Sequence, residues 1–179
     1  MRSAGPRAIF LFLFGFSRLR AAIGLGAEVS TRVERTGNLR LRAPAARAFL
    51  LFTPDGERAW AGPAWNPQIV CSKNGQNEEG MVFRNGQDKA LWIVSRLDPA
   101  ARVIEYVIVR DDVYTILRCE VADGGQKEAL ATVTYRWISR TPAGNEMAKS
   151  HDLHFTPMLA GWERAMNAVL EREETPAPK

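Results

Sequence analysis

Two histidines in the segment "HDLH" are the residues of this chain best suited to metal or proton chemistry. His151 and His154 are three positions apart, so on a helix they share one side and could bind a metal. Neither Glu146 nor Asp152 aligns with both, so no third ligand is evident. Ser150, His151 and Asp152 adjoin in sequence, whereas the members of a catalytic triad face one another in space. We therefore expect no metal site and no triad here.

A histidine on that helix could instead face the mouth of a cavity, where it donates to a ligand carbonyl or transfers a proton. His154 is our candidate for that position. The simpler interpretation, which we favour, is a histidine on the helix face that is bonded to backbone or water. Tyr106 and Tyr135 are the other polar candidates. A buried tyrosine needs a hydrogen-bond partner, so each orients a ligand or bonds within the core.

The sequence contains no motif that binds a cofactor. It has no glycine-rich phosphate loop, no CxxC pair and no nucleophile elbow. We therefore expect neither a metal nor an organic cofactor.

Apolar residues spaced by three and four positions predict one long helix near the C-terminus, from Met147 to Leu170. Pro157 lies within it and removes one backbone donor, so we expect a kink. Alternatively, Thr156 caps a helix that starts at Pro157. That arrangement leaves a structureless loop of roughly 16 residues, which is disfavoured in a compact domain. We choose the long kinked helix.

Seven segments before this helix have the pattern of β-strands. They cover residues 29–41, 68–73, 80–86, 89–98, 102–110, 113–123 and 128–140. Two short helices are expected between the first and second strands, over residues 44–53 and 54–60. The later strands follow one another through short turns, which predicts an antiparallel meander, because parallel strands need long crossovers.

A curved antiparallel sheet must cover its apolar concave face, and only the C-terminal helix is large enough to do so. The sequence therefore predicts an α+β fold in which a seven-stranded antiparallel sheet wraps around one long helix.

The order of elements, together with "LFTPDGERAWAGPAWNP", "YRWISRTPAGNE" and "WERAMNAVL", resembles the START-like (SRPBCC) superfamily. The resemblance is greatest to small bacterial proteins grouped with polyketide cyclases and lipid-transport proteins, and it covers residues 29–172. It implies the helix-grip fold and a cavity between sheet and helix. That fold hosts carriers, cyclases and other proteins, and no catalytic signature carries over, so the resemblance implies no activity.

Strand alternation divides the side chains between the two faces of the sheet. On the fourth strand we expect Ile93 to face the concave side, and Trp92 and Val94 to face the convex side with Val103, Val107 and Val109. The residues expected to line a ligand cavity are Phe83, Ile93, Tyr106, Ile108, Leu117, Tyr135 and Trp137 on the sheet, with His154, Met158 and Trp162 on the helix. For Trp60 and Trp65 we favour a packing role at the joint between the short helices and the long one. The alternative is a place at the rim of the cavity.

The charge distribution does not indicate a nucleic-acid partner. Four of the 24 basic residues and none of the 20 acidic residues lie in positions 1–27, so the rest of the chain carries 20 of each. A nucleic-acid binder needs a basic face on its folded part.

Residues 1–28 form a leader that we place outside the fold. Its apolar run "AIFLFLFGF" follows two arginines, as in a signal peptide, but it is too short to span a bilayer and no good cleavage site follows. The alternative is a translation start at Val29. Residues 29–172 form the domain and residues 173–179 a frayed tail. We expect a cytoplasmic protein, exported if the leader is a true signal, with no stable membrane insertion of its folded domain.

Three functions remain in competition. The first, which we favour, is non-enzymatic binding of a hydrophobic or aromatic small molecule, because the predicted cavity has few titratable groups. The second is a cyclase or dehydratase-like enzyme that uses tyrosine and histidine in the same cavity. The third is an interaction module that forms a homodimer through apolar residues on the convex face.

Overall fold

The computed structural model describes residues 30–85 and 90–174. The leader predicted over residues 1–28 lies outside the described residues. So does the tail predicted over residues 173–179, except for its first two residues, which end the last helix.

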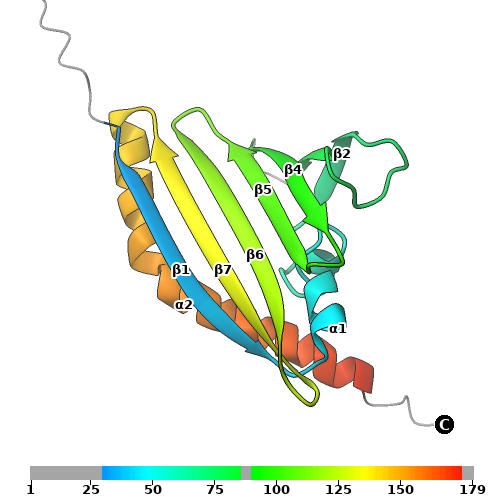
Figure 1. The fold of residues 1–179 in the computed structure, drawn as a ribbon. Helices are drawn as coiled ribbons and strands as arrows, with labels where there is room; N and C mark the ends of the chain where they lie inside the picture. The colour runs from blue at the N-terminus through cyan, green and yellow to red at the C-terminus, as the bar shows by residue number, and fades with distance from the viewer. Residues whose placement is uncertain (1–29, 86–89, 175–179) are drawn as a thin grey trace, which may run out of the picture.

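The elements follow one another in the predicted order (Figure 1). They are β1 (Arg32–Leu41), α1 (Ala45–Leu50), the 3-10 helix η1 (Gly56–Ala59), β2 (Pro67–Cys71), β3 (Val82–Asn85), β4 (Leu91–Asp98), β5 (Val103–Val109), β6 (Val113–Gly125), β7 (Glu128–Ser139) and α2 (Pro142–Glu174). The described strands form one seven-stranded sheet in the order β1-β7-β6-β5-β4-β3-β2, and every neighbouring pair is antiparallel. The predicted fold class is confirmed.

The C-terminal helix is continuous, as predicted, and begins with a capped turn. The Thr141 hydroxyl accepts a hydrogen bond from the Gly144 N–H at 3.1 Å, and Pro142 occupies the first helical position, where its missing donor costs nothing. Pro157 lies inside the helix, and Figure 1 shows that α2 bends part-way along its length. None of the described helices has a stretch long and apolar enough to cross a membrane.

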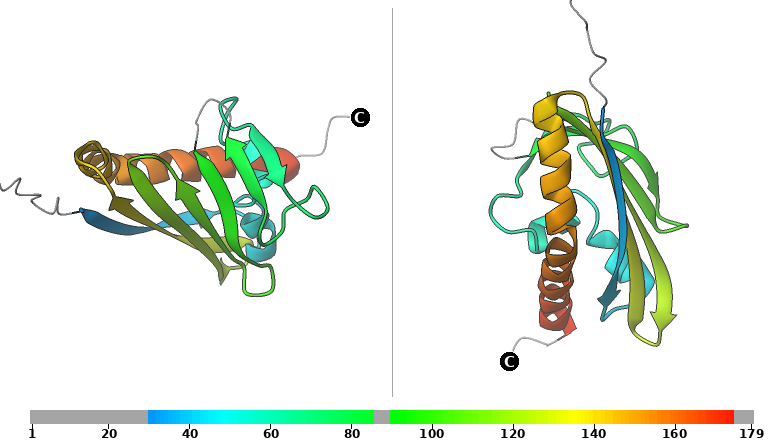
Figure 2. Two further views of the ribbon diagram at one scale, coloured as in Figure 1. Left: turned by 90° about the horizontal axis from the view of Figure 1, so that it is seen from above. Right: turned by 90° about the vertical axis from the view of Figure 1, so that its left-hand side faces the viewer.

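The helix lies along one face of the curved sheet (Figure 2) and also covers the edge strand β1. Its Glu163 carboxylate accepts a hydrogen bond from the Arg40 N–H at 2.8 Å. Its Asn167 amide accepts from the Arg42 N–H at 2.8 Å and donates to the Arg40 carbonyl at 2.9 Å. These side chains occupy backbone groups that an edge strand otherwise leaves free. These hydrogen bonds hold α2 against β1 along one side of the interior.

Most of the predicted strand faces are confirmed. The side chains of β5, β6 and β7 that were expected to face the helix are buried, namely Ile104, Tyr106, Ile108, Leu117, Cys119, Val133, Tyr135 and Trp137. Val107 and Val109 point to the other face, as expected.

The predicted faces of β4 are wrong for its first half. Trp92 and Val94 are buried, whereas Ile93 pairs with Val107 on the convex face. The cause is a β-bulge at Ser95, where the register with β5 shifts. One extra residue reverses the alternation, so counting back from the inward-facing Leu97 assigns the wrong face to every residue before the bulge. Ile93 therefore cannot line the interior, and Trp92 does.

Candidate functional site

A cavity of about 310 Å³ lies between the segment around η1, the sheet and α2, and it is partly open to solvent. Its wall is made by Glu57, Trp60, Ala61 and Trp65 from the η1 segment, Trp92, Leu117 and Tyr135 from the sheet, and Gly161, Trp162 and Ala165 from α2. This volume is at the lower end of the range for small-molecule sites.

The two tryptophans of the η1 segment are held by their indole N–H groups. Trp60 donates to the Leu51 carbonyl at 2.7 Å, and Trp65 donates to the Pro54 carbonyl at 2.9 Å. Each polar end is therefore satisfied within the loop, and the ring itself can face the cavity. The packing role that we favoured for these residues and the alternative at the rim are both present.

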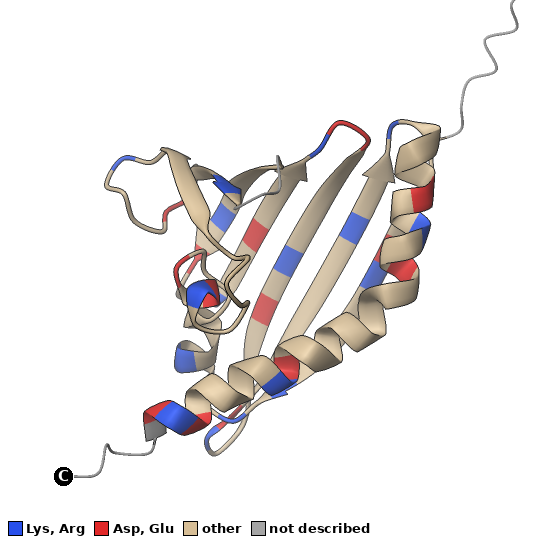
Figure 3. Cartoon of the chain, turned by 180° about the vertical axis from the view of Figure 1, so that it is seen from behind, with Lys and Arg blue, Asp and Glu red and all other residues tan. Residues whose placement is uncertain are grey.

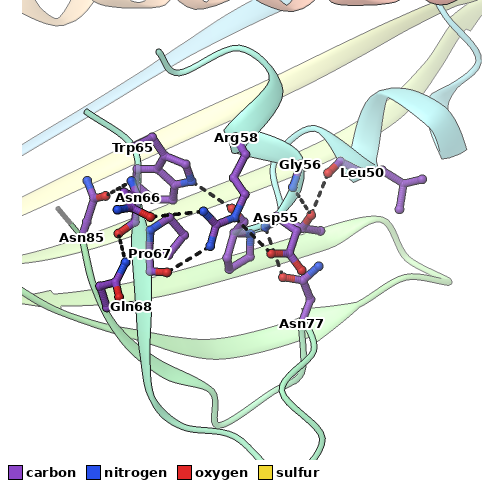
Figure 4. Close-up of polar contacts among 12 residues, drawn as sticks. Leu50, Asp55, Gly56, Arg58, Trp65, Asn66, Pro67, Gln68, Asn77 and Asn85 are labelled. Carbon is purple, nitrogen blue, oxygen red and sulfur yellow. Dashed lines mark hydrogen bonds and ion pairs between the residues drawn. The ribbon is translucent and has the colours of Figure 1, made fainter. Parts of the chain in front are cut away.

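Arg58 and the asparagines next to it fasten the end of the same segment (Figure 4). The Arg58 guanidinium donates to the Pro67 carbonyl at 3.0 Å and to the Asn66 side chain at 3.4 Å. The Asn66 N–H donates to the side chain of Asn85 at 2.8 Å, which ties the segment to β3. These hydrogen bonds tie the end of the η1 segment to the neighbouring strands.

Glu57 is placed by a tight turn at the start of η1. The Thr53 hydroxyl accepts from the Gly56 N–H at 3.1 Å, and the Thr53 carbonyl accepts from the Glu57 N–H at 2.9 Å. A Cβ atom at Gly56 would lie 1.8 Å from the Leu50 carbonyl oxygen, so only glycine fits. This close approach directs the next side chain, Glu57, toward the interior.

Aromatic rings from four elements meet around the cavity. Trp65 contacts Trp92 edge-to-face, with ring centroids 5.2 Å apart. Trp60 contacts Trp162 in the same way at 5.1 Å, and Trp162 lies 6.2 Å from Tyr135. Such contacts hold the rings in defined orientations. The wall is therefore both apolar and pre-formed.

Two small residues on α2 keep the cavity open. Gly161 and Ala165 lie one turn apart on its lining, and a Cβ atom at Gly161 would have no packing neighbour within 4 Å. Glycine in a helix interior costs about 0.5–1 kcal/mol relative to alanine, and here no close contact requires it. A filled core would use a larger residue at this position. The structure thus has a hollow where the sequence could not distinguish a pocket from a packed core.

The carboxyl group of Glu57 is buried in this wall without a partner. The residue is 5% exposed, and no hydrogen bond or ion pair reaches its carboxyl from the described residues. Burial raises its pKa well above the usual value of 4.5. Burial therefore favours the protonated form of Glu57, in which the carboxyl group can both donate and accept a hydrogen bond.

Two further polar groups of the wall also have no partner among the described residues. The Trp92 indole N–H is buried without an acceptor, and no hydrogen bond reaches the hydroxyl of Tyr135. Burial, then Cys119 and Glu57, raises the pKa of Tyr135 well above its usual value, so it stays protonated. Tyr106 differs, because its hydroxyl donates to the Phe52 carbonyl at 2.7 Å. Glu57, Trp92 and Tyr135 are the groups left for a ligand.

The residues predicted for the site fall into three groups. Leu117, Tyr135 and Trp162 line the cavity. Five others belong to the core or pack against it without forming the wall, namely Phe83, Tyr106, Ile108, Trp137 and Met158. The last two, Ile93 on the convex face and His154 on the exposed side of α2, lie away from it.

The two histidines do not form a site together. His154 is exposed, and its Nδ1 lies 2.7 Å from the Ser150 carbonyl oxygen of its own helix. His151 is half-buried and stacks on Trp137 with ring centroids 5.4 Å apart. Burial, then the charges of Arg110 and His154, lowers the pKa of His151. Within residues 30–85 and 90–174, no group of three or more histidine, cysteine or acidic side chains could hold a metal ion.

Sequence reasoning missed Glu57, Trp92 and Gly161. The only signal for Glu57 is an acid between an apolar run and two tryptophans, in a segment rich in prolines and glycines. Gly161 could have been noticed as a glycine within a helical pattern. Trp92 was seen but assigned to the wrong face because of the bulge.

Figure 3 shows that the middle of α2 carries no charged residue, and the sequence from 153 to 162 has none. The long helix thus presents an uncharged stretch beside a curved sheet. Several solved structures share the fold of this chain. A START superfamily protein from Mycobacterium smegmatis matches with a TM-score of 0.58 at 15% identity, over 78% of this chain and 97% of that one. The chain has the START-like helix-grip fold. Neither a protein-family model nor a curated protein matches the sequence.

Two other solved structures share this helix-grip fold. Ara h 8.0201 has a TM-score of 0.60 at 15% identity, over 79% of this chain and 99% of that one. Norcoclaurine synthase from Thalictrum flavum, in complex with dopamine and hydroxybenzaldehyde, has a TM-score of 0.60 at 12% identity, over 96% of this chain and 100% of that one. At these identities the likeness concerns the fold alone.

Proposed function

We propose that this protein binds an apolar, aromatic small molecule in the cavity between the η1 segment, the sheet and α2, without a metal or organic cofactor. The observation that carries the proposal is the hollow at Gly161, surrounded by the rings of four tryptophans and one tyrosine. A ligand that fills it gains about 25 cal/mol for each Å² of apolar surface buried. The few polar groups of the wall fix its orientation.

The helix-grip fold is able to hold such molecules. The norcoclaurine synthase structure contains dopamine and hydroxybenzaldehyde, which are both small and aromatic. That comparison supports the class of ligand proposed here.

Titration with the neutral fluorescent probe N-phenyl-1-naphthylamine tests this function. Wild-type protein should bind it saturably, with a rise in fluorescence. Gly161→Leu should abolish the rise, because the new side chain occupies the hollow. Gly161→Ala is the matched control and should retain binding, because it adds one methyl group. If Gly161→Leu is folded and binds the probe as well as wild type does, the cavity is not the binding site.

A second function, acid–base catalysis, is favoured by Glu57. In its ionised form, a carboxyl with a raised pKa is a stronger base, and it can take a proton from the carbon next to a carbonyl group while the Tyr135 hydroxyl of the same wall donates to the carbonyl oxygen, which is the chemistry of cyclases and dehydratases. The pair would be Glu57 with Tyr135 instead of the tyrosine and histidine first considered. Exchange of the α-protons of 2-indanone in D₂O, followed by NMR, tests it. Exchange that the protein accelerates and Glu57→Gln abolishes would support an enzyme, and exchange at the buffer rate would count against one.

The third alternative, a dimerising module, keeps only part of its predicted patch. Its predicted convex patch included Trp92, which lies in the cavity wall instead. The remaining convex residues, such as Ile93 and Val107, are half-buried within the sheet.

A further inference from the structure

Glu57 poses a physical problem in the empty cavity. A carboxyl group removed from water is destabilising unless hydrogen bonds or an opposite charge compensate it. Neither reaches Glu57 from the described residues, and the wall that they form contains no lysine, arginine or histidine. The positioning of the segment depends on Thr53, Gly56 and Arg58, and the Glu57 carboxyl contributes nothing to it. The cavity is the side from which a compensating group can reach this carboxyl, and an occupant of the cavity can supply that group.

The tryptophans of the wall also favour a positively charged ligand. The face of an aromatic ring is negative, and among the aromatic side chains tryptophan attracts cations most strongly. Trp60, Trp65, Trp92 and Trp162 all contribute to the wall. A positive charge inside would interact both with these rings and with an ionised Glu57. A neutral ligand of the same shape would gain only from burial.

We propose that the ligand is an organic cation, an amine or quaternary ammonium group on an apolar body, whose charge lies against the Glu57 carboxylate and the tryptophan rings. This inference rests on the proposed function and narrows the class of ligand for the same cavity. A neutral carbonyl compound, which could accept hydrogen bonds from Tyr135 and Trp92, is the competing ligand that the experiment must separate.

The proposal has a pH signature. The titratable groups that face Glu57 from the sheet are Tyr106, Cys119 and Tyr135, whose raised pKa values keep them neutral. Asp55 and Arg58 of its own segment are exposed. Burial favours the protonated form of Glu57 and a bound cation favours the ionised form, so binding of the cation releases a proton at any pH below the pKa that Glu57 has without the ligand. Below the pKa of Glu57, the apparent affinity for the cation should rise tenfold per pH unit.

A matched pair of probes tests the charge alone. Phenyltrimethylammonium and tert-butylbenzene have the same shape, with a positive nitrogen in place of a neutral carbon. Displacement of N-phenyl-1-naphthylamine gives the affinity of each at neutral pH, and calorimetry of the cation in two buffers with different ionisation heats counts the protons released. The competing class is tested with acetophenone, a neutral ketone.

Two variants accompany the probes. Glu57→Gln keeps the shape of the side chain but cannot ionise. Glu128→Gln removes one acid from the exposed start of β7 and controls for net charge. Wild type and Glu128→Gln should prefer the cation at least tenfold and release protons when they bind it. Glu57→Gln should lose at least tenfold in affinity for the cation, release no proton, and bind tert-butylbenzene within twofold of wild type.

The outcomes separate this inference from the proposed function. If wild type binds tert-butylbenzene or acetophenone as well as the cation, or better, the cation is wrong as the ligand class, but binding of an apolar molecule stands. A cation preference that survives Glu57→Gln also overturns the inference, because the charge is then not held by this carboxyl. If none of the probes binds, the proposed function fails together with the inference.

Discussion

Glu57 is the residue whose environment differs most from what its chemistry favours. Acidic side chains are almost never fully buried unless they are paired, and this one is 5% exposed with no partner among the described residues. Its burial is imposed by its neighbours, since the turn at Thr53 and Gly56 sets the direction of its side chain. Such a group destabilises the empty protein and is available to a ligand.

Replacing this carboxyl by an amide should stabilise the protein. In the unfolded chain Glu57 titrates near its ordinary pKa, whereas burial raises the pKa in the folded state. Between these two values the folded state holds the extra proton, so the free energy of unfolding falls as pH rises. The Glu57→Gln variant has no carboxyl group at this position, so its free energy of unfolding does not fall with pH for this reason. Its melting temperature should match that of wild type near pH 4 and exceed it increasingly as the pH rises above 4.5.

Thermal unfolding of both proteins across this pH range measures the difference. Contributions from other groups cancel, because they are shared by the two proteins. A difference that does not change with pH would mean that Glu57 is ionised and hydrated in the folded protein, contrary to the structure.

Trp162 should contribute less to stability than a fully buried tryptophan. It borders the cavity and is only half-buried, so part of its volume already faces open space. We expect Trp162→Ala to lower the free energy of unfolding by about 2 kcal/mol. Removing a fully buried aromatic side chain typically costs about 3–5 kcal/mol. Trp137 is 2% exposed and packs away from the cavity, so Trp137→Ala should cost the full amount. Denaturant titration compares them, and equal costs would mean that Trp162 is packed on all sides.

The predictability of the site residues from sequence depends on the regularity of their surroundings. Leu117 and Tyr135 follow strict alternation, and Trp162 follows the helical period, so all three could be placed on the correct face. Glu57 could not, because a four-residue 3-10 turn has no period long enough to reveal its orientation. Whether the space among these residues is empty depends on packing at Gly161, which no pattern encodes.

At the scale of elements, the segment from α1 to β2 determines the shape of the site. It supplies four of the lining residues and is held by hydrogen bonds from its own tryptophans and from Arg58. Its prolines and glycines end each short helix, which is why the two helices and the breaks between them could be predicted. The bulge in β4 could not, because one extra residue within a strand leaves no mark on its composition.

A methyl group at Gly56 should disrupt this segment. The new Cβ atom would lie 1.8 Å from a backbone oxygen of Leu50, so the chain itself must move. We expect Gly56→Ala to destabilise the protein by about 1–3 kcal/mol, as overpacking usually does, and to weaken binding of N-phenyl-1-naphthylamine at least tenfold. Melting experiments and the same dye titration measure both effects. Gly161→Ala is the control and should be slightly more stable than wild type. Normal binding by Gly56→Ala would show that the turn does not shape the cavity.

At the scale of the whole molecule, the sheet and α2 enclose more space than their side chains fill. The helix lies along the sheet and is fixed at one edge by Glu163 and Asn167, which bond to the backbone of β1. The η1 segment closes the opposite side of the cavity. The order of elements and the antiparallel arrangement could be read from the sequence, because short connections leave few other topologies.

The most direct test of the central claim, that an aromatic ligand occupies this cavity, uses the five tryptophans of the chain as reporters. Four of them line the cavity, and Trp137 lies behind Tyr135 with ring centroids 5.1 Å apart. The indole N–H signals of ¹⁵N-labelled protein are followed by NMR during titration with 4-ethylphenol and assigned with single tryptophan-to-phenylalanine variants. Trp60, Trp65, Trp92 and Trp162 should shift along one saturable curve, while Trp137 shifts least. Signals that do not move, or a largest shift at Trp137, would contradict a ligand site in this cavity.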